Sequence, residues 1–408
     1  MKRPLPSPRL SLLCLFLAAT GCGTADRDPA FIERDSAGVT IAESTAPAWL
    51  KGEGWQVADE PLLELGGKEH QSGHLFDRVL GARRLPDGRI VVVDGGSATL
   101  RWFSAEGRFL FQRGGWGGGP SEFELLSPPL SSPGPDAVVV LSGRGRYALF
   151  DTEGRRSDVR VPPSLPYLEN PARLPDGAWV AWPLGRLSAA TVPERYPRAL
   201  VRIDPDGSAV DTLAVLQGIG ATGGTFQIPV GMQYLSLPHY VFGGQTSMTV
   251  VGEALVLATA ADYQVNFHDG RAEVRRIVRW AGPDLTVSAQ DRSAYVAFRE
   301  KQLRDAGVTD PARLAAARSE AERGPYASHH AAYGRMHADP AGRLWLRDVN
   351  PPGVHQETYS VLDTNGRLLG DVAMPEGFRT FQIGPDWVLG LWRDALDVEH
   401  VRLHALLR

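Results

Sequence analysis

The sequence predicts an all-β protein folded as a six-bladed β-propeller, in which each blade is a four-stranded sheet. Three observations predict this fold. A tight turn followed by a short apolar strand occurs six times, a second strand-and-turn unit follows it, and most of these repeats are spaced by the length of one blade. The composition agrees with this, because 45 Gly and 31 Pro among 408 residues supply many turns without reaching the content of a disordered chain.

The clearest repeat lies between Leu85 and Arg108. Pro86-Asp87-Gly88 combines a preset first dihedral, a side chain that bonds the backbone ahead and a residue free to take positive φ, so it predicts a tight turn. Residues 90–93 are a β-branched run that suits a buried strand. Residues 100–107 supply a second short strand and a second turn, so the segment makes up most of a four-stranded meander.

The same turn chemistry marks the start of five further units. Successive anchors lie 40–49 residues apart, except for two gaps of 77 and 88 residues. A four-stranded blade takes about 40–50 residues, so both long gaps predict insertions. The five further anchors are Pro135-Asp136, Pro175-Asp176-Gly177, Gly252-Glu253, Asp339-Pro340-Ala341-Gly342 and Pro385-Asp386.

The two insertions differ in kind. Residues 217–241 are Gly-rich without a clear period and predict a long loop. Residues 288–323 predict a helical hairpin between blades four and five. Ser288 and Asp291 form a capping-box pattern, Gly307 ends the first helix, and Asp310-Pro311 begins the second. The hairpin is either a partner-binding arm or a filler.

The two ends of the chain are expected to close the ring. The last unit ends at Arg408 without a visible fourth strand, whereas residues 38–42 and 55–65 are strand-like and precede the first anchor. We therefore expect an N-terminal strand to complete the last blade, which removes free sheet edges. The propeller is expected to span residues 38–408.

The N-terminus has the pattern of a bacterial export signal. Lys2, Arg3 and Arg9 precede or flank the start of an apolar run over residues 10–19, which is too short to span a membrane. The following Ala-Thr-Gly-Cys22 resembles a lipobox, although Ala19 stands where Leu is commonest. The resemblance implies that residues 1–21 are removed, that Cys22 is lipidated and that residues 22–37 form a linker. A plain secretory signal is the alternative.

Cysteine content and charge narrow the function further. Only Cys14 and Cys22 are present, so the propeller itself has no disulfide and no thiol nucleophile. Gly23, rather than Asp, follows the lipidated position and by resemblance favours the outer membrane. The formal net charge of −4 becomes −7 once the three cations of residues 1–21 are removed, which disfavours nucleic acid as a partner.

The repeat resembles that of a known family. Residues 114–123, Gly-Gly-Trp-Gly-Gly-Gly-Pro-Ser-Glu-Phe, look like the Gly-rich inter-blade turn of six-bladed propellers related to NHL repeats. The resemblance covers about residues 38–408 and is strongest over 76–155. It implies a face that binds a partner, because better-known relatives bind protein or RNA in this way. More distant six-bladed relatives are lactonases and lyases.

Most patterns that point to chemistry have a simpler interpretation. No Gly-Lys-Ser/Thr follows the Gly-rich turn, and no Gly-x-Ser-x-Gly occurs, so neither a phosphate loop nor a serine nucleophile is expected. His329, His330 and His337 lack the carboxylates of a metal motif and are expected at the surface or in a loop. Core packing between blades is expected for Trp102, Trp179, Trp182, Trp345, Trp387 and Trp392.

Polar residues at the starts of the innermost strands remain as site candidates. These strands line the central channel of a propeller, so their first residues should meet at one mouth. Oxygen ligands there could hold Ca²⁺, as in gluconolactonase-like propellers, and the cation could polarise a lactone carbonyl. A solvated polar pore lining is the plainer interpretation. The candidates are Asp77, Arg78, Glu169, Asn170, Tyr333, Arg335 and Arg379.

Two functions remain. The first is a lipid-anchored binding or scaffolding module of the bacterial cell envelope that presents a propeller face to a protein, peptide or glycan, without a cofactor and as a monomer. The second is a metal-dependent propeller hydrolase or lyase that works at the channel mouth. We favour the first, because the sequence shows a repeat and an anchor but no catalytic constellation.

Overall fold

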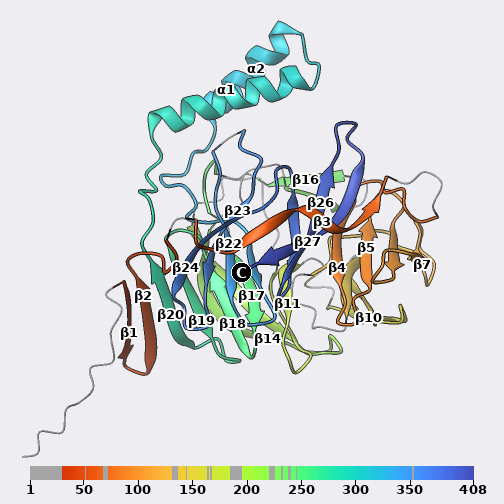
Figure 1. Cartoon of the computed structure of the whole chain (residues 1–408), viewed down its shortest axis with the longest axis horizontal. Coiled ribbons are helices and arrows are strands. Elements are labelled where there is room, and N and C mark those ends of the chain that lie inside the picture. The colour runs from red at the N-terminus through yellow and green to blue at the C-terminus, as the bar shows by residue number, and fades with distance from the viewer. Residues whose placement is uncertain are drawn as a thin grey trace, which may run out of the picture.

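The computed structural model describes residues 30–50, 52–67, 72–130, 137–143, 145–162, 165, 168–183, 195–219, 226–230, 233–237, 240–244, 246–351 and 353–408. For residues 160, 169–170, 195–198, 216–219, 226–230 and 233–237 it describes the backbone alone. Six β-sheets are arranged as the blades of a propeller, as the sequence predicts (Figure 1). None of the helices in the described residues is long and apolar enough to cross a membrane.

The first three blades follow one another along the chain. Each is an antiparallel meander. In the second blade the segment 127–130 takes the innermost position, where Leu130 N–H donates to Val139 O at 2.9 Å and the Ser127 hydroxyl accepts from Leu141 N–H at 2.9 Å. The strands are β4 (Val79–Arg84), β5 (Ile90–Asp94), β6 (Thr99–Phe103) and β7 (Phe109–Gly114); β8 (Val138–Gly143), β9 (Arg146–Phe150) and β10 (Arg156–Arg160); β11 (Leu168–Arg173), β12 (Trp179–Pro183), β13 (Arg195–Ile203) and β14 (Val210–Ile219).

The last three blades draw on both ends of the chain. The two N-terminal strands extend the fourth blade, and β3 completes the sixth. The strands are β17 (Ser247–Val251), β18 (Ala254–Ala258), β19 (Gln264–His268) and β20 (Val274–Trp280) with β2 (Val39–Ser44) and β1 (Phe31–Ser36); β21 (Met336–Ala338), β22 (Leu344–Arg347), β23 (Thr358–Leu362) and β24 (Leu368–Ala373); β25 (Arg379–Ile383), β26 (Trp387–Arg393) and β27 (Glu399–Leu407) with β3 (Gln56–Gly66).

Ring closure occurs as predicted, but only one of the two N-terminal segments takes part. Strand β3 pairs antiparallel with β27 and closes the last blade. The segment 38–42, which we expected there as well, instead supplies residues 39–42 of β2, which pairs parallel with β20 of the fourth blade. Residues 31–36, within the linker predicted over 22–37, form β1 and pair with β2. Ile41 and Ala42 are buried there, so apolar burial explains the added strand.

Both insertions contain regular structure. The helical hairpin is confirmed as α1 (Ala289–Asp305) and α2 (Pro311–Arg323), with the Ser288–Asp291 capping box and Asp310 as the second N-cap. The segment predicted as a long loop over 217–241 holds a further hairpin, made of β15 (Phe226–Val230) and β16 (Gln233–Leu237). The loop prediction was therefore wrong for these residues. Two short paired strands contain too few residues to show a clear hydrophobic periodicity in the sequence.

The core consists of apolar wedges between neighbouring blades. Trp102 of the first blade stacks on Phe111 at 5.0 Å between ring centroids and meets Phe150 of the second blade edge-on at 5.8 Å. Of the six tryptophans assigned to the core, five are at most 8% exposed and Trp392 is half-buried. Large aromatic side chains thus fill the space that widens away from the channel axis.

The two faces of the propeller differ. In a four-stranded meander, the connections alternate between faces, and the links between blades leave from the same face as the link from second to third strand. We call this the loop face. It carries both insertions, and Figure 1 shows α1 and α2 projecting from the side where β16 also lies. The opposite face, the turn face, carries tight turns such as 85–89, 104–108 and 363–367.

Candidate functional site

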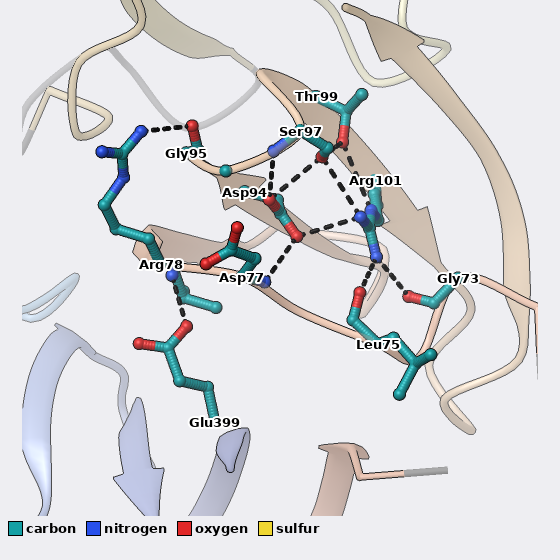
Figure 2. A network of polar contacts seen from close by, with 12 residues as sticks. Gly73, Leu75, Asp77, Arg78, Asp94, Gly95, Ser97, Thr99, Arg101 and Glu399 are labelled. Atoms are coloured by element: carbon teal, nitrogen blue, oxygen red, sulfur yellow. Dashed lines mark hydrogen bonds and ion pairs between the residues drawn. The ribbon is translucent and has the colours of Figure 1, made fainter. Parts of the chain in front are cut away.

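A buried ion pair positions the first site candidates on the loop face. Asp94 at the end of β5 is fully buried and pairs with Arg101 of β6, with 2.9 Å between Oδ2 and Nη2. Asp94 also accepts from the backbone N–H of Asp77 at 3.1 Å and of Ser97 at 3.0 Å. Figure 2 shows Asp94 between the Asp77 backbone and the Arg101 guanidinium.

Arg101 uses its remaining donors on the chain that enters the first blade. Its Nη1 donates to Gly73 O at 3.1 Å and also to Leu75 O (Figure 2). Its Nε donates to the Thr99 hydroxyl at 3.3 Å. Since a buried charge is tolerated only when its bonds are satisfied, this network is structural, and it fixes the path of residues 73–77.

Asp77 and Arg78 are exposed beside this network. Arg78 has a positive φ of 57°, which is uncommon for a residue with a side chain, and its Nη2 donates to Gly95 O at 2.6 Å. The Asp77 carboxylate has no hydrogen-bond or ion-pair partner within the described ranges. The two candidates are thus adjacent on the loop face, and hydrogen bonds to Asp94 and Gly96 fix the backbone of Asp77.

Glu399 joins the last blade to the first at this mouth. Its Oε2 accepts from the backbone N–H of Val79 at 2.6 Å, and its Oε1 pairs with Arg393 at 2.6 Å. Arg379, the first residue of β25, donates from Nη2 to Val79 O at 2.9 Å. Both backbone groups of Val79 that face the last blade are thus bonded, and the Glu399 side chain is only 7% exposed.

A second polar group links the fifth and sixth blades. Glu357 accepts from the Thr380 backbone N–H at 2.9 Å and from the Tyr359 hydroxyl at 3.1 Å, and pairs with Arg347 at 3.1 Å. Arg335 is exposed, and in the part of the chain that the structure describes its side chain has no hydrogen bond or ion pair.

The arginines at the mouth influence one another. Burial lowers the pKa of Arg379, and the nearby positive charges of Arg335 and Arg393 lower it further, while Glu399 and Glu357 oppose this shift. Such a group of guanidiniums and engaged carboxylates presents hydrogen-bond donors to a ligand. It offers no nucleophile with an adjacent base among the described residues.

Tyr333 is not part of the mouth. Its side chain is 1% exposed, its hydroxyl donates to Gln264 O at 2.6 Å, and its ring lies 5.6 Å from that of Trp280. Burial raises the pKa of Tyr333 well above its usual range. The prediction for this residue was wrong, because its side chain points into the wedge between blades four and five rather than into the channel.

Three further candidates are tested only in part or not at all. Glu169 and Asn170 lie in β11, an innermost strand as predicted, but their side chains are outside the described part. Cys22, the expected lipidation site, lies outside the described residues.

His337 differs from its prediction as a surface or loop histidine. It lies in β21 and is 7% exposed, and its Nε2 has no hydrogen-bond partner among the residues that the structure describes. Burial lowers the pKa of His337 to about 3, and the charges of Arg335 and Arg347 act in the same direction. The imidazole is therefore neutral at physiological pH.

A cation at the mouth would need free oxygen ligands. Among the described residues, no three His, Cys, Asp or Glu side chains gather in the manner of a metal site. Glu357 and Glu399 are occupied by protein donors, which leaves Asp77 as the free carboxylate of the described mouth. The described residues therefore do not by themselves fit the Ca²⁺ site considered from the sequence.

Sequence reasoning missed Glu357, Glu399, Asp94 and Arg101. Each of these residues bonds to a partner on another strand. The partner of Glu399 is Val79, which is 320 residues away in the sequence. Their only sequence signal is a charged residue beside an otherwise apolar strand, as with Asp94 after residues 90–93 and Arg101 between two apolar residues.

The chain resembles several solved propellers at low sequence identity. A Bacteroides fragilis exported protein is 16% identical, with a TM-score of 0.49, over 90% of this chain and 99% of that one. A member of the DUF4221 family from Bacteroides vulgatus is 10% identical, with a TM-score of 0.46, over 86% and 98%. A gluconolactonase from Xanthomonas campestris is 13% identical, with a TM-score of 0.40, over 88% and 99%.

No family model matches the sequence, and no curated protein matches it. With TM-scores below 0.5, the structural similarities do not bear on what this chain binds or catalyses. The function is therefore argued from the chain's own residues.

Proposed function

We propose that the chain is an exported, lipid-anchored propeller that binds a protein, peptide or glycan of the cell envelope on its loop face. The observation that carries the proposal is the difference between the two faces. The turn face is built from short, hydrogen-bonded turns, whereas the loop face bears the helical hairpin, the β15–β16 hairpin and the long connection over residues 348–357. Extra chain on one face of a rigid scaffold is typical of a binding surface.

The mouth at the centre of this face supports binding rather than bond-making chemistry. Arg78, Arg335 and Arg379 present donors to solvent, and the nearby carboxylates of Glu357 and Glu399 hold backbone groups of the neighbouring blades. A metal-dependent hydrolase or lyase would need carboxylates released for a cation. The lipid on Cys22 would keep the propeller at a membrane, with the outer membrane favoured and the chain acting as a monomer.

Site-specific photo-crosslinking in intact cells tests the face. A photoreactive residue replaces Leu396, which is 84% exposed on the loop face, or Arg108, whose side chain is 79% exposed on the turn face. We expect a discrete adduct from position 396 and none from position 108. Adducts from position 108 alone, or equally from both, would contradict the proposal.

The anchor and the alternative function have separate tests. Cys22→Ser should abolish incorporation of an azide-tagged fatty acid and release the protein from the membrane fraction. Elemental mass spectrometry on the purified protein should show no stoichiometric cation. One equivalent of Ca²⁺ that a chelator removes together with hydrolysis of a lactone substrate would instead favour the enzyme.

A further inference from the structure

Trp116 is an exposed aromatic residue that core packing does not explain. All ten tryptophans of the chain lie within the described ranges, and Trp116 is the most exposed of them, at 53%. It lies on the loop face, in the Gly-rich connection between β7 and the second blade. An exposed indole leaves a large apolar surface in water, so a fixed one indicates a contact with something outside the chain.

The indole is held in place rather than free to fold away. Its Nε1–H donates to Gly96 O at 2.8 Å. The turn on either side is bonded to Phe123, whose N–H donates to Gly115 O at 2.9 Å and whose carbonyl accepts from Gly117 N–H at 3.2 Å. Since Phe123 is fully buried, the turn is anchored in the core, and the ring has no polar group left to satisfy.

The free carboxylate of Asp77 contacts the same glycine. A Cβ atom on Gly96 would lie 2.1 Å from Asp77 Oδ2, so only glycine allows this approach. The backbone of Asp77 is fixed at both ends, because its N–H donates to Asp94 at 3.1 Å and its carbonyl accepts from Gly96 N–H at 2.7 Å. The carboxylate is thus pre-positioned beside the residue that holds Trp116.

Arg78 completes this corner of the loop face. Its guanidinium bonds the neighbouring Gly95 O at 2.6 Å, and the residue is otherwise exposed. The dipeptide Gly95-Gly96 therefore carries three groups around it: an aromatic ring, an acceptor-only carboxylate and a donor-only guanidinium. We refer to Trp116, Asp77 and Arg78 as the Trp116 corner.

We propose that the Trp116 corner binds a neutral pyranose residue of a glycan. The inference rests on the proposed function and narrows it to one ligand class. A pyranose has one face of C–H groups that packs on an aromatic ring and a rim of hydroxyls that both donate and accept. Sugar hydroxyls that donate to the Asp77 carboxylate and accept from the Arg78 guanidinium would satisfy both charged groups with charge-assisted hydrogen bonds.

The charges at the corner select against the other ligands that an aromatic residue attracts. A cationic group would be attracted by the Trp116 ring and the Asp77 carboxylate but repelled by the Arg78 guanidinium. An anionic group would gain from Arg78 but would face the Asp77 carboxylate. A neutral, hydroxyl-rich ligand meets neither repulsion, so the opposite charges on adjacent residues favour it.

Calorimetry with soluble hexasaccharides tests the proposal on the full chain carrying Cys22→Ser. The probes are hexamers of β-1,4-glucose, β-1,4-xylose, α-1,4-glucose and β-1,4-N-acetylglucosamine, with α-1,4-galacturonate as the anionic comparator. We expect at least one neutral hexamer to bind, with affinity reduced about tenfold or more by Trp116→Ala, as for other aromatic stacking contacts. Asp77→Asn, which keeps the size of the side chain, should also weaken binding.

Two further variants separate a contact from a change in folding. Trp116→Phe keeps a ring but loses the bond to Gly96, so it should retain part of the affinity that Trp116→Ala loses. Arg108→Ala, at an exposed residue of the turn face, should leave the affinity unchanged.

Three results would overturn the sugar site. They are no binding of any neutral hexamer at about 1 mM, where even a weak site is occupied, equal affinity of Trp116→Ala and wild type, or tighter binding of galacturonate than of the neutral hexamers. If crosslinking from position 396 still succeeds in that case, the sugar site fails while the proposed binding function of the loop face stands.

Discussion

Glu399 shows how much of the propeller's polar stability depends on single buried side chains. It is the acceptor for Val79 N–H across the seam between the first and last blades, and within the last blade it is the partner of Arg393. Because the carboxylate is almost completely buried, its removal leaves a backbone donor without water or protein as a partner.

We expect Glu399→Ala to lower the free energy of unfolding by about 2–3 kcal/mol, the usual penalty for leaving buried groups of this kind unpaired. Urea denaturation of the wild type and the variant measures this loss. Glu376→Ala, at an exposed carboxylate in the neighbouring connection, is the matched control and should change stability by less than about 0.5 kcal/mol. Equal stability of both variants would mean that the seam does not depend on Glu399.

His337 gives the chain a specific sensitivity to acid. Its pKa of about 3 in the folded state lies below the usual value of 6.5, so the folded protein keeps it neutral while the unfolded chain takes up a proton. The corresponding stability is complete above about pH 6.5 and is lost as the pH falls toward 3. Asp348 acts in the opposite direction, because burial raises the pKa of its carboxyl to about 6 and stability is lost as the pH rises from about 4 to 6.

The substitution His337→Leu separates the two effects. Between pH 6.5 and 5 the wild type should lose about 2 kcal/mol of stability relative to the variant, because each pH unit across this window changes the proton balance by about 1.4 kcal/mol. Denaturation curves at pH 7.5, 6.0 and 5.0 give the difference. His355→Leu, at an exposed histidine, is the control. A constant difference between wild type and His337→Leu at all three pH values would contradict a buried neutral imidazole.

Among the elements, the helical hairpin is the one most independent of the core. Helix α1 buries no residue and α2 buries only Ala321. The hairpin contacts the propeller through aromatic side chains at its base, where Phe242 lies 5.7 Å from Tyr295 and 5.9 Å from Tyr326 between ring centroids. Its two ends lie together, since Val287 N–H donates to Ser328 O at 3.1 Å.

We therefore expect the hairpin to be replaceable. A Gly-Ser-Gly linker in place of residues 290–322 should leave the propeller folded and shift the free energy of unfolding by only about 1 kcal/mol, because little apolar area is lost. Thermal unfolding followed by circular dichroism measures the change. Leu389→Ala, at a fully buried residue, is the reference for loss of a core side chain and should lower the free energy of unfolding by about 2–5 kcal/mol. A larger loss from the linker than from Leu389→Ala would make the hairpin part of the core.

The sequence predicted those elements whose signals are local. Five of the six turn anchors lie in the described residues, and each precedes the second strand of a blade, whereas Pro135-Asp136 lies outside them. The capping box and Pro311 mark the helices. The β1–β2 strands were misplaced because β2 pairs with β20, more than 200 residues away, and no local pattern specifies a parallel partner.

The candidate site was predictable only to the level of strand order. Asp77, Arg78, Arg335 and Arg379 lie at the channel mouth because each immediately precedes or begins an innermost strand. Tyr333 precedes an innermost strand as well, yet its side chain points into a wedge, because residues 331–335 lie outside a strand and their side-chain directions do not follow strand alternation. Glu357 and Glu399 were missed because their partners lie in other blades.

At the scale of the whole molecule, ring closure depends on a single strand. Strand β3 covers the outer edge of β27, whose Val401, Leu403 and Leu406 are buried. Without β3 the sixth blade would present an unpaired apolar edge, which invites pairing between molecules.

A chain that starts at residue 67 should therefore fail to give a soluble monomer, whereas a chain that starts at residue 45 should remain folded. The longer chain loses only β1 and β2. Their removal takes the buried Ile41 and Ala42 out of the fourth blade. It also removes the hydrogen bond that Leu368 N–H donates to the Ser44 hydroxyl at 2.9 Å. Size-exclusion chromatography and near-ultraviolet circular dichroism distinguish the two results. A monomeric, cooperatively folding chain from residue 67 would show that closure by β3 is dispensable.

The pairing of β3 with β27 also sets the order in which the molecule can be completed during its synthesis. The two strands join residues such as Ala58 and His404, which are separated by 346 positions and bonded at 2.8 Å. Because a chain is synthesised from its N-terminus, β3 stays unpaired until the strands of the sixth blade have been made. The seam between the first and last blades is consequently the last part to form. A chain in which β3 has not yet paired with β27 has all of its blades but an open ring.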